Sequence, residues 1–167
     1  MLSMKHELKV CLWFDGNAEE AAKFYIDVFK DAKIINRSFY GNEGFEYHGK
    51  TPGTLLTIEL QLKSLNLLLL NGDHSFKFNE AMSLVITCDT QEEVDYYWQR
   101  LTYKGDPSAQ VCGWLKDQFG LSWQVVPTRL DELLNDPDPK KVDAVSKVMF
   151  NQSKIIIKDL EEAYQNA

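Results

Sequence analysis

Residues 8–29 show two successive patterns of hydrophobic and polar positions. The first is typical of a strand and the second of a helix. Residues 8–14 (LKVCLWF) are apolar and rich in strand formers, and the Asp15–Gly16 pair after them is a turn signal. Asn17 stands three residues before Glu20, a pattern that predicts a helix cap. Apolar residues then recur at helical spacing, at Ala21, Phe24, Tyr25, Val28 and Phe29. This region therefore predicts a strand, a turn and a helix.

The same order returns in the second half of the chain. Residues 83–88 (SLVITC) read as a strand, and Thr90 stands three residues before Glu93, which again predicts a helix cap. Apolar positions follow at Val94, Tyr97, Trp98 and Leu101. The segment 17–25 (NAEEAAKFY) aligns with 90–98 (TQEEVDYYW), with Glu-Glu and the aromatic residues at matching places. We interpret this match as internal duplication of a strand–helix unit.

Further strands are predicted after each helix, over 34–40, 54–62 and 65–71 in the first half and over 108–112, 114–117 and 121–126 in the second. Each half then has the order βαβββ. The segment 41–53 contains four glycines and a proline, which indicates a long and mobile loop of the kind that often closes over a binding site. Residues 112–123 (CGWLKDQFGLSW) predict the last hairpin, with a turn at 117–120.

A helical segment is predicted from Thr128 onward. It contains a short helix, then Asp138 as an N-cap before Pro139, a stripe at Val142, Val145, Val148 and Met149, and a last helix. We expect these helices to pack on the sheet or on a second subunit. The predicted organisation is a first module at 1–72, a second at 73–127 and an extension at 128–167, all within one compact domain.

Composition narrows the possible functions. The net charge of −7 argues against a general nucleic-acid or anionic-membrane binder, because such proteins need a basic surface. The longest aliphatic run, 67–70, is far too short to cross a bilayer, and the N-terminal residues show no apolar stretch of signal-peptide length, so we expect a cytoplasmic protein. The three cysteines, Cys11, Cys88 and Cys112, form no CxxC motif and are expected to be buried, reduced thiols.

Three segments carry a resemblance to a known family: LWFDGNAEEAAKFY, FKFNEAMSLVITCDTQEEVDYYW and CGWLKDQFGLSWQVVPT. With them the chain resembles the PhnB-like branch of the vicinal oxygen chelate superfamily, whose members often carry the label 3-demethylubiquinone-9 3-methyltransferase and are relatives of glyoxalase I and bleomycin-resistance proteins. The resemblance implies an α+β fold of two βαβββ modules that form curved mixed sheets around a cavity, with a C-terminal helical extension. It also implies a homodimer.

In metal-using relatives the cavity holds a divalent ion bound by His, Glu or Gln. The corresponding positions here are Lys9, Ala81 or Met82, and Gln124. Lysine would have to lose its proton, and alanine or methionine offers no hard ligand. The histidines, His6, His48 and His74, have no metal-ligand spacing. We therefore predict no catalytic metal and no cofactor.

The methyltransferase label also finds no support in the residues. The chain has no GxGxxG motif and no run of parallel βα units, which S-adenosylmethionine-dependent enzymes with doubly wound sheets use to hold their cofactor.

Strand alternation predicts which side chains line the cavity. They are Lys9, Cys11, Trp13, Thr57, Glu59, Ser83, Thr87, Trp114, Ser122 and Gln124. Cys112 is interpreted as a small buried residue at a strand end rather than a nucleophile.

The predicted function is the binding of a small molecule of unidentified nature, with or without catalysis. Three alternatives remain open. They are a divalent-metal-dependent lyase, isomerase or dioxygenase, a protein that sequesters a drug, and a demethylubiquinone methyltransferase.

Overall fold

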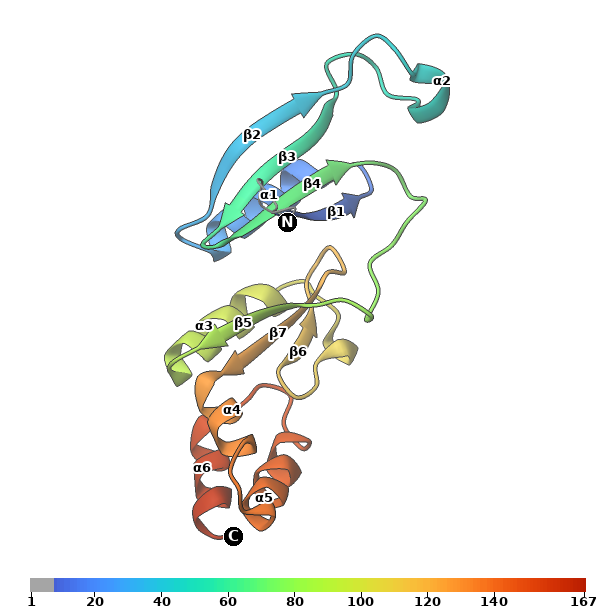
Figure 1. Cartoon of the computed structure of the whole chain (residues 1–167). Coiled ribbons are helices and arrows are strands. Elements are labelled where there is room, and N and C mark those ends of the chain that lie inside the picture. Colours follow the sequence, from blue (N-terminus) through green and yellow to red (C-terminus); the bar gives the residue numbers. More distant parts are fainter. Residues whose placement is uncertain (1–7) are drawn as a thin grey trace, which may run out of the picture. The chain divides into compact units, whose positions relative to one another are not determined.

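The structure, a computed structural model, describes residues 8–167 and divides into two compact units (Figure 1). The first unit runs to Lys77 and the second from Phe78 to Ala167. Helices and strands are mixed in both, as the α+β prediction requires. Within residues 8–167, no helix combines the length and the apolar character that crossing a membrane would need. The prediction about His6 falls outside the described residues.

The first unit is one mixed sheet with a helix on one face. The strands are β1 (Val10–Phe14), β2 (Lys33–Phe39), β3 (Leu55–Leu62) and β4 (Leu65–Asn71), in the order β1-β4-β3-β2. Strands β1 and β4 are parallel, and the other pairs are antiparallel. Helix α1 (Ala18–Val28) lies behind the sheet in Figure 1.

Alternation along the strands explains why α1 lies where it does. Leu12, Phe14, Ile58 and Leu60 are buried, and their neighbours in sequence are more exposed. A half-covered sheet requires this pattern, since successive side chains point to opposite faces. On α1, Tyr25 is one of the residues that pack at full burial.

The predicted cap of α1 is wrong in its detail. The side chain of Asn17 makes no cap hydrogen bond. Instead the buried Asn71 at the end of β4 accepts from the backbone N–H of Ala18 at 3.2 Å and donates to the carbonyl of Leu55 at 3.0 Å. A residue far away in sequence thus satisfies an N–H group that the helix itself leaves unpaired.

The segment 41–53, which the sequence predicts as a loop, includes a short helical element. It contains α2 (Phe45–His48), a single helical turn with Gly44 and Gly49 at positive φ on either side. Nδ1 of His48 accepts from the backbone N–H of Lys50 at 3.0 Å, and its ring lies 4.5 Å from that of Tyr40. His48 is therefore part of the local structure of this loop.

The second unit has a smaller sheet and four α-helices. Its strands are β5 (Leu84–Cys88), β6 (Trp114–Lys116) and β7 (Ser122–Pro127), in the order β5-β7-β6. Strands β5 and β7 are parallel, and β6 and β7 are antiparallel. Helix α3 (Gln91–Thr102) packs on one face, and Thr90 caps it by accepting from the N–H of Glu93 at 3.2 Å, as predicted.

The predicted strand over 108–112 is wrong. The chain there forms the short 3-10 helix η1 (Pro107–Ala109), followed by an isolated bridge between Val111 and Trp114. Asp106 caps η1 through the N–H of Ser108 at 2.9 Å, and Pro107 has no N–H to donate to a sheet. The second unit consequently has no counterpart of β2.

Three helices complete the second unit, namely α4 (Thr128–Leu134), α5 (Pro139–Met149) and α6 (Ile157–Gln165). Asp138 caps α5 through the N–H of Lys140 at 3.0 Å, with Pro139 at the first position, as predicted. Their shared core consists of Leu130, Leu133, Val145, Ile155 and Leu160. We call residues 128–167 the extension.

Candidate functional site

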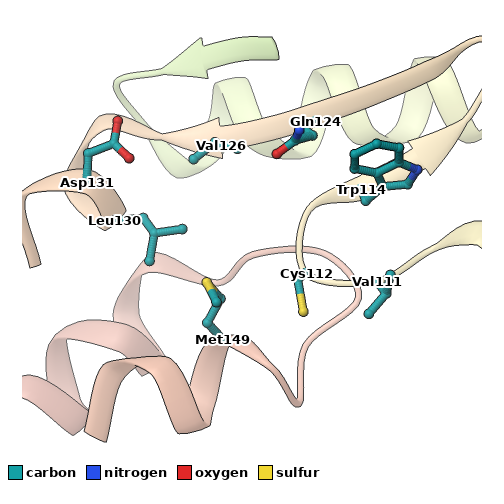
Figure 2. A pocket seen from close by; sticks show the side chains of 8 residues that line it. All are labelled: Val111, Cys112, Trp114, Gln124, Val126, Leu130, Asp131 and Met149. Carbon is teal, nitrogen blue, oxygen red and sulfur yellow. The ribbon is translucent and has the colours of Figure 1, made fainter. Parts of the chain in front are cut away.

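A cavity of about 400 Å³ lies between the second sheet and the extension (Figure 2). One face of the sheet is covered by α3, while the other face bears Gln124 and Trp114. Most of the wall is apolar. The lining residues are Val111, Cys112, Trp114, Gln124, Val126, Leu130, Asp131 and Met149.

The register of the strands places Gln124 on the cavity wall. Its neighbours in β7, Trp123 and Val125, are almost fully buried and point to the opposite face. Nε2 of Gln124 donates to the hydroxyl of Ser83 at 2.9 Å, which fixes the amide. Figure 2 shows its oxygen turned toward the interior of the cavity. Trp114 lies directly opposite Gln124 on β6.

The segment 111–113 forms a second wall. Cys112 and Gly113 have φ angles of 51° and 81°, in the left-handed region. A Cβ atom at position 113 would lie 2.8 Å from the carbonyl oxygen of Val125, so only glycine fits there. The N–H groups of Cys112 and Gly113 donate to the carbonyls of Gln152 and Ser153 at 2.8 and 2.7 Å. The extension thereby holds this segment with the half-buried Cys112 at the cavity.

The third wall comes from the extension itself. Leu130 and Met149 line the cavity from α4 and α5, and the exposed Asp131 lies at its rim. On α3, Gln91 attaches the extension. Its Nε2 donates to the carbonyl of Ile155 at 3.0 Å, and its Oε1 accepts from the N–H of Ile157 at 2.8 Å.

The ten residues predicted to line a cavity fall into two groups of five. In the second unit, Trp114 and Gln124 line the cavity, and Ser83 holds Gln124 in place. Thr87 is exposed on β5 beside Val126. Ser122 is fully buried, and residues 8–167 offer its hydroxyl no hydrogen-bond partner.

The five residues of the first unit share the face of its sheet opposite α1. They are Lys9, Cys11, Trp13, Thr57 and Glu59. Lys9 forms a hydrogen-bonded ion pair with Glu59. Thr57 shares a 2.6 Å hydrogen bond with Ser38.

The side chains of Trp13 and Cys11 differ in their surroundings. The indole N–H of Trp13 donates to the carbonyl of Asp73 at 2.8 Å, and its ring meets that of Phe76 edge-on at 5.0 Å. Cys11 is exposed, so the prediction that it is buried is wrong, but partial desolvation by its neighbours still raises the pKa of its thiol. A raised pKa leaves less of the reactive thiolate at neutral pH.

The alternation that places Gln124 on the cavity wall also places Val126 there, two residues further along β7. Sequence reasoning did not assign five other lining residues to the cavity: Val111, Cys112, Leu130, Asp131 and Met149. The helical stripe through Met149 did predict that α5 packs against another element. Which side of that stripe borders a cavity depends on tertiary packing, which the pattern does not contain.

The residues at the metal positions of the superfamily do not fit a divalent ion. Lys9 is paired with Glu59, Ala81 has no donor atom, and Met82 offers only a thioether. Gln124 remains as a single neutral ligand. Across residues 8–167, no three His, Cys, Asp or Glu side chains gather closely enough to hold a metal together.

The first strand–helix turn does not fit S-adenosylmethionine any better than the metal positions fit a divalent ion. Such a group would use the free N–H groups at the start of α1. The N–H of Ala18 there is already bonded to Asn71, and the sheet has a single parallel pair, β1 with β4.

Comparison with known proteins gives a consistent assignment. Residues 6–126 match the family model described as 3-demethylubiquinone-9 3-methyltransferase. Among solved structures, a putative 3-demethylubiquinone-9 3-methyltransferase, PhnB protein, from Bacillus cereus is 31% identical. That match covers 74% of this chain and 100% of the relative, with a TM-score of 0.60.

The genomically encoded fosfomycin resistance protein FosX from Listeria monocytogenes has the same fold. It is 15% identical over 80% of this chain and 100% of its own, with a TM-score of 0.54. No curated protein matches the chain. The family match ends at residue 126, just before α4, so Leu130, Asp131 and Met149 lie outside it.

Proposed function

Because the chain belongs to the 3-demethylubiquinone-9 3-methyltransferase family, a PhnB-like branch of the vicinal oxygen chelate superfamily, we propose that it binds a small molecule in the cavity of its second unit, without a tightly bound catalytic metal. The observation that supports this proposal most directly is the position of the Gln124 amide. Ser83 fixes this amide, which projects from an apolar wall into a cavity of about 400 Å³. Small-molecule sites typically have this size and combine apolar walls with a few oriented polar groups.

Cys112 provides a direct probe of this proposal. Its thiol lines the cavity, whereas Cys11 lies on the sheet of the first unit and Cys88 is buried. A bound molecule should slow alkylation of Cys112 by N-ethylmaleimide and leave the rate at Cys11 unchanged. Peptide-resolved mass spectrometry measures both rates in the same molecule, across a set of neutral, cationic and anionic fragments.

The variant Met149→Trp supplies the matched control, because a larger side chain should fill the cavity from α5. Fragments that protect Cys112 in the parent protein should lose their effect in it. If fragments bind by calorimetry but none changes the alkylation of Cys112, the cavity is not the binding site and the proposal fails.

The metal-dependent alternative makes a different prediction. A lyase, isomerase or dioxygenase of the superfamily would carry near-stoichiometric Ni, Zn, Mn or Fe, and its melting temperature would rise on adding that ion. We expect neither result. Elemental analysis that finds one metal per chain, lost in Gln124→Ala, would overturn the metal-free part of the proposal.

One observation favours the methyltransferase hypothesis, namely the description of the matching family. It predicts measurable binding of S-adenosylmethionine, which isothermal titration calorimetry tests directly. Because the N–H of Ala18 at the start of α1 already donates to Asn71, we expect no heat of binding. Binding that persists in Met149→Trp would support the methyltransferase reading.

We also propose that the protein works in the cytoplasm as a homodimer. The face of the first sheet that bears Cys11 and Trp13 is opposite to α1, and a second copy could cover it. Multi-angle light scattering should then give twice the chain mass of 19.3 kDa at micromolar protein. A monomer under those conditions would refute the dimer.

A further inference from the structure

We infer that the cavity selects an organic cation with an apolar body, and that the extension supplies the selectivity through Asp131. This inference rests on the proposed function, since it names the class of ligand that the same cavity would take.

The strong hydrogen-bond acceptors at the cavity are two oxygen-bearing groups, the side-chain amide of Gln124 and the carboxylate of Asp131. The Gln124 amide donates one hydrogen bond from Nε2 to Ser83, and its oxygen faces the interior (Figure 2). The indole nitrogen of Trp114 lies on the side of its ring away from Cys112 and Leu130 (Figure 2). A ligand that satisfies such a wall must itself donate hydrogen bonds.

The charge at the cavity is negative. Asp131 is an exposed carboxylate, and no ion pair joins it to another side chain of residues 8–167. The nearby cation Arg129 is already paired with Glu132 at 2.7 Å and with Glu161 at 3.1 Å. No lysine or arginine is among the lining residues. A cationic ligand therefore meets attraction at the rim, and an anionic one meets repulsion.

The remaining walls suit the other end of such a molecule. Leu130, Val126 and Met149 offer aliphatic and thioether surface, and the face of Trp114 attracts a cation as well as an apolar body. Leu130, Asp131 and Met149 lie beyond the family match at residue 126, so this selectivity would belong to the extension rather than to the family's shared fold.

Three probes of nearly equal shape test the inference: phenethylammonium, phenethyl alcohol and phenylacetate. Each carries the same aromatic body and differs in the charge of its head group. Affinities measured by NMR titration, together with protection of Cys112 from alkylation, should rank the cation first and the anion last. Because Asp131 is exposed, we expect the cation to exceed the alcohol by roughly 2- to 5-fold at low salt, and by less at high salt.

The substitution Asp131→Asn should reduce the affinity for phenethylammonium to that for the alcohol and leave the alcohol unchanged. Asp143→Asn is the matched control, because Asp143 is exposed on α5, outside the cavity lining, and its loss changes the net charge equally. The control should keep the preference for the cation.

Equal affinity for all three probes, or tighter binding of phenylacetate, would overturn the inference while leaving the cavity as a binding site. The same holds if the preference survives in Asp131→Asn. If none of the probes binds and none protects Cys112, both the inference and the proposed cavity function are contradicted for ligands of this size.

Discussion

Asp117 shows how much one side chain organises in the last hairpin of the second unit. Its carboxylate is 2% exposed and accepts from the backbone N–H groups of Phe119 and Leu121 at 2.8 and 3.1 Å, and from the indole N–H of Trp123 at 2.9 Å. The two oxygens of one carboxylate thus fix both the turn and the adjacent strand β7, which carries Gln124. Lys116, the preceding residue, points elsewhere and pairs with Glu80.

Replacing Asp117 with asparagine should destabilise the protein. The amide keeps one acceptor oxygen but directs N–H groups at a cluster that supplies only donors, so at least one buried donor loses its partner. We expect a loss of about 1–3 kcal/mol in the free energy of unfolding, measured by urea denaturation. Asp143→Asn, which removes an exposed carboxylate, should change it little. Equal effects of the two substitutions would contradict this role of Asp117.

Because Gly72 has no side chain, the indole ring of Trp13 can pack directly against the backbone at position 72. A Cβ atom at position 72 would lie 2.2–2.6 Å from three atoms of the indole ring, closer than any van der Waals contact. Gly72→Ala should therefore displace Trp13 from its hydrogen bond to Asp73, with a cost of about 1–3 kcal/mol. Near-ultraviolet circular dichroism and urea denaturation follow the two effects.

Gly41→Ala is the control for this substitution. Nothing lies within 4 Å of a Cβ atom at position 41, so the same chemical change meets open space there. If Gly72→Ala is tolerated as well as Gly41→Ala, the close approach to Trp13 does not constrain the fold.

At the scale of elements, two residues of α3, Gln91 and Asp95, attach the extension. Gln91 makes two hydrogen bonds to the backbone of residues 155 and 157, and Lys154 pairs with Asp95 one turn further along the helix. These contacts fix the segment between α5 and α6. In the same segment, the carbonyls of Gln152 and Ser153 accept hydrogen bonds from the N–H groups of Cys112 and Gly113.

Gln91→Ala should loosen the extension and with it the cavity. Two backbone groups lose their partner, which we expect to lower the free energy of unfolding by about 1–3 kcal/mol and to increase the alkylation rate of Cys112. Gln99→Ala removes an exposed glutamine from the same helix and should have little effect on either. Unchanged Cys112 reactivity in Gln91→Ala would show that the extension does not depend on this contact.

The elements that the sequence predicted well are those with a complete local signal. Strands β1, β3 and β4 are short segments rich in strand formers, helices α1, α3 and α5 show apolar residues at helical spacing, and Asp138–Pro139 marks the start of α5. The strand expected over 108–112 failed because its apolar residues are too few to outweigh Pro107 and the left-handed backbone at Cys112. The prediction of Asn17 as a cap failed because the side chain of Asn71, far away in sequence, accepts the hydrogen bond from the N–H of Ala18 instead.

At the scale of the whole molecule, acid should weaken the second unit. The hydrogen bond from Lys154, followed by that from Gln91, lowers the pKa of Asp95, and the hydroxyl of Tyr164 does the same for Asp136. A carboxyl whose pKa is lower in the folded state contributes stability above its unfolded pKa, near about 4, and loses it as the pH falls through the folded value.

The free energy of unfolding should therefore fall between neutral pH and about pH 3, and fall less in the double variant Asp95→Asn/Asp136→Asn. Both carboxyls contact the extension or its linkers, so the effect should also appear as faster alkylation of Cys112 relative to Cys11 in acid. A double variant with the same pH dependence as the parent protein would mean that other carboxyls account for it.

How far the site could be predicted depends on where each wall comes from. Strand alternation put Trp114 and Gln124 on one face of a sheet, since that period is local. The walls formed by Leu130, Met149 and Cys112 depend on how the extension returns to the sheet, and no local pattern carries that information. The two candidate groups of five residues lie on different sheets.

The central claim is that the cavity of the second unit binds a small molecule rather than a catalytic metal. The side-chain amide signals of Gln124 in a ¹H–¹⁵N NMR spectrum test both halves of it, with assignment through Gln124→Asn. The account predicts that phenethylammonium shifts these signals in a saturable way and that stoichiometric Mn²⁺ leaves them sharp. Gln124 signals that do not shift on addition of phenethylammonium but are broadened by Mn²⁺ would contradict this claim.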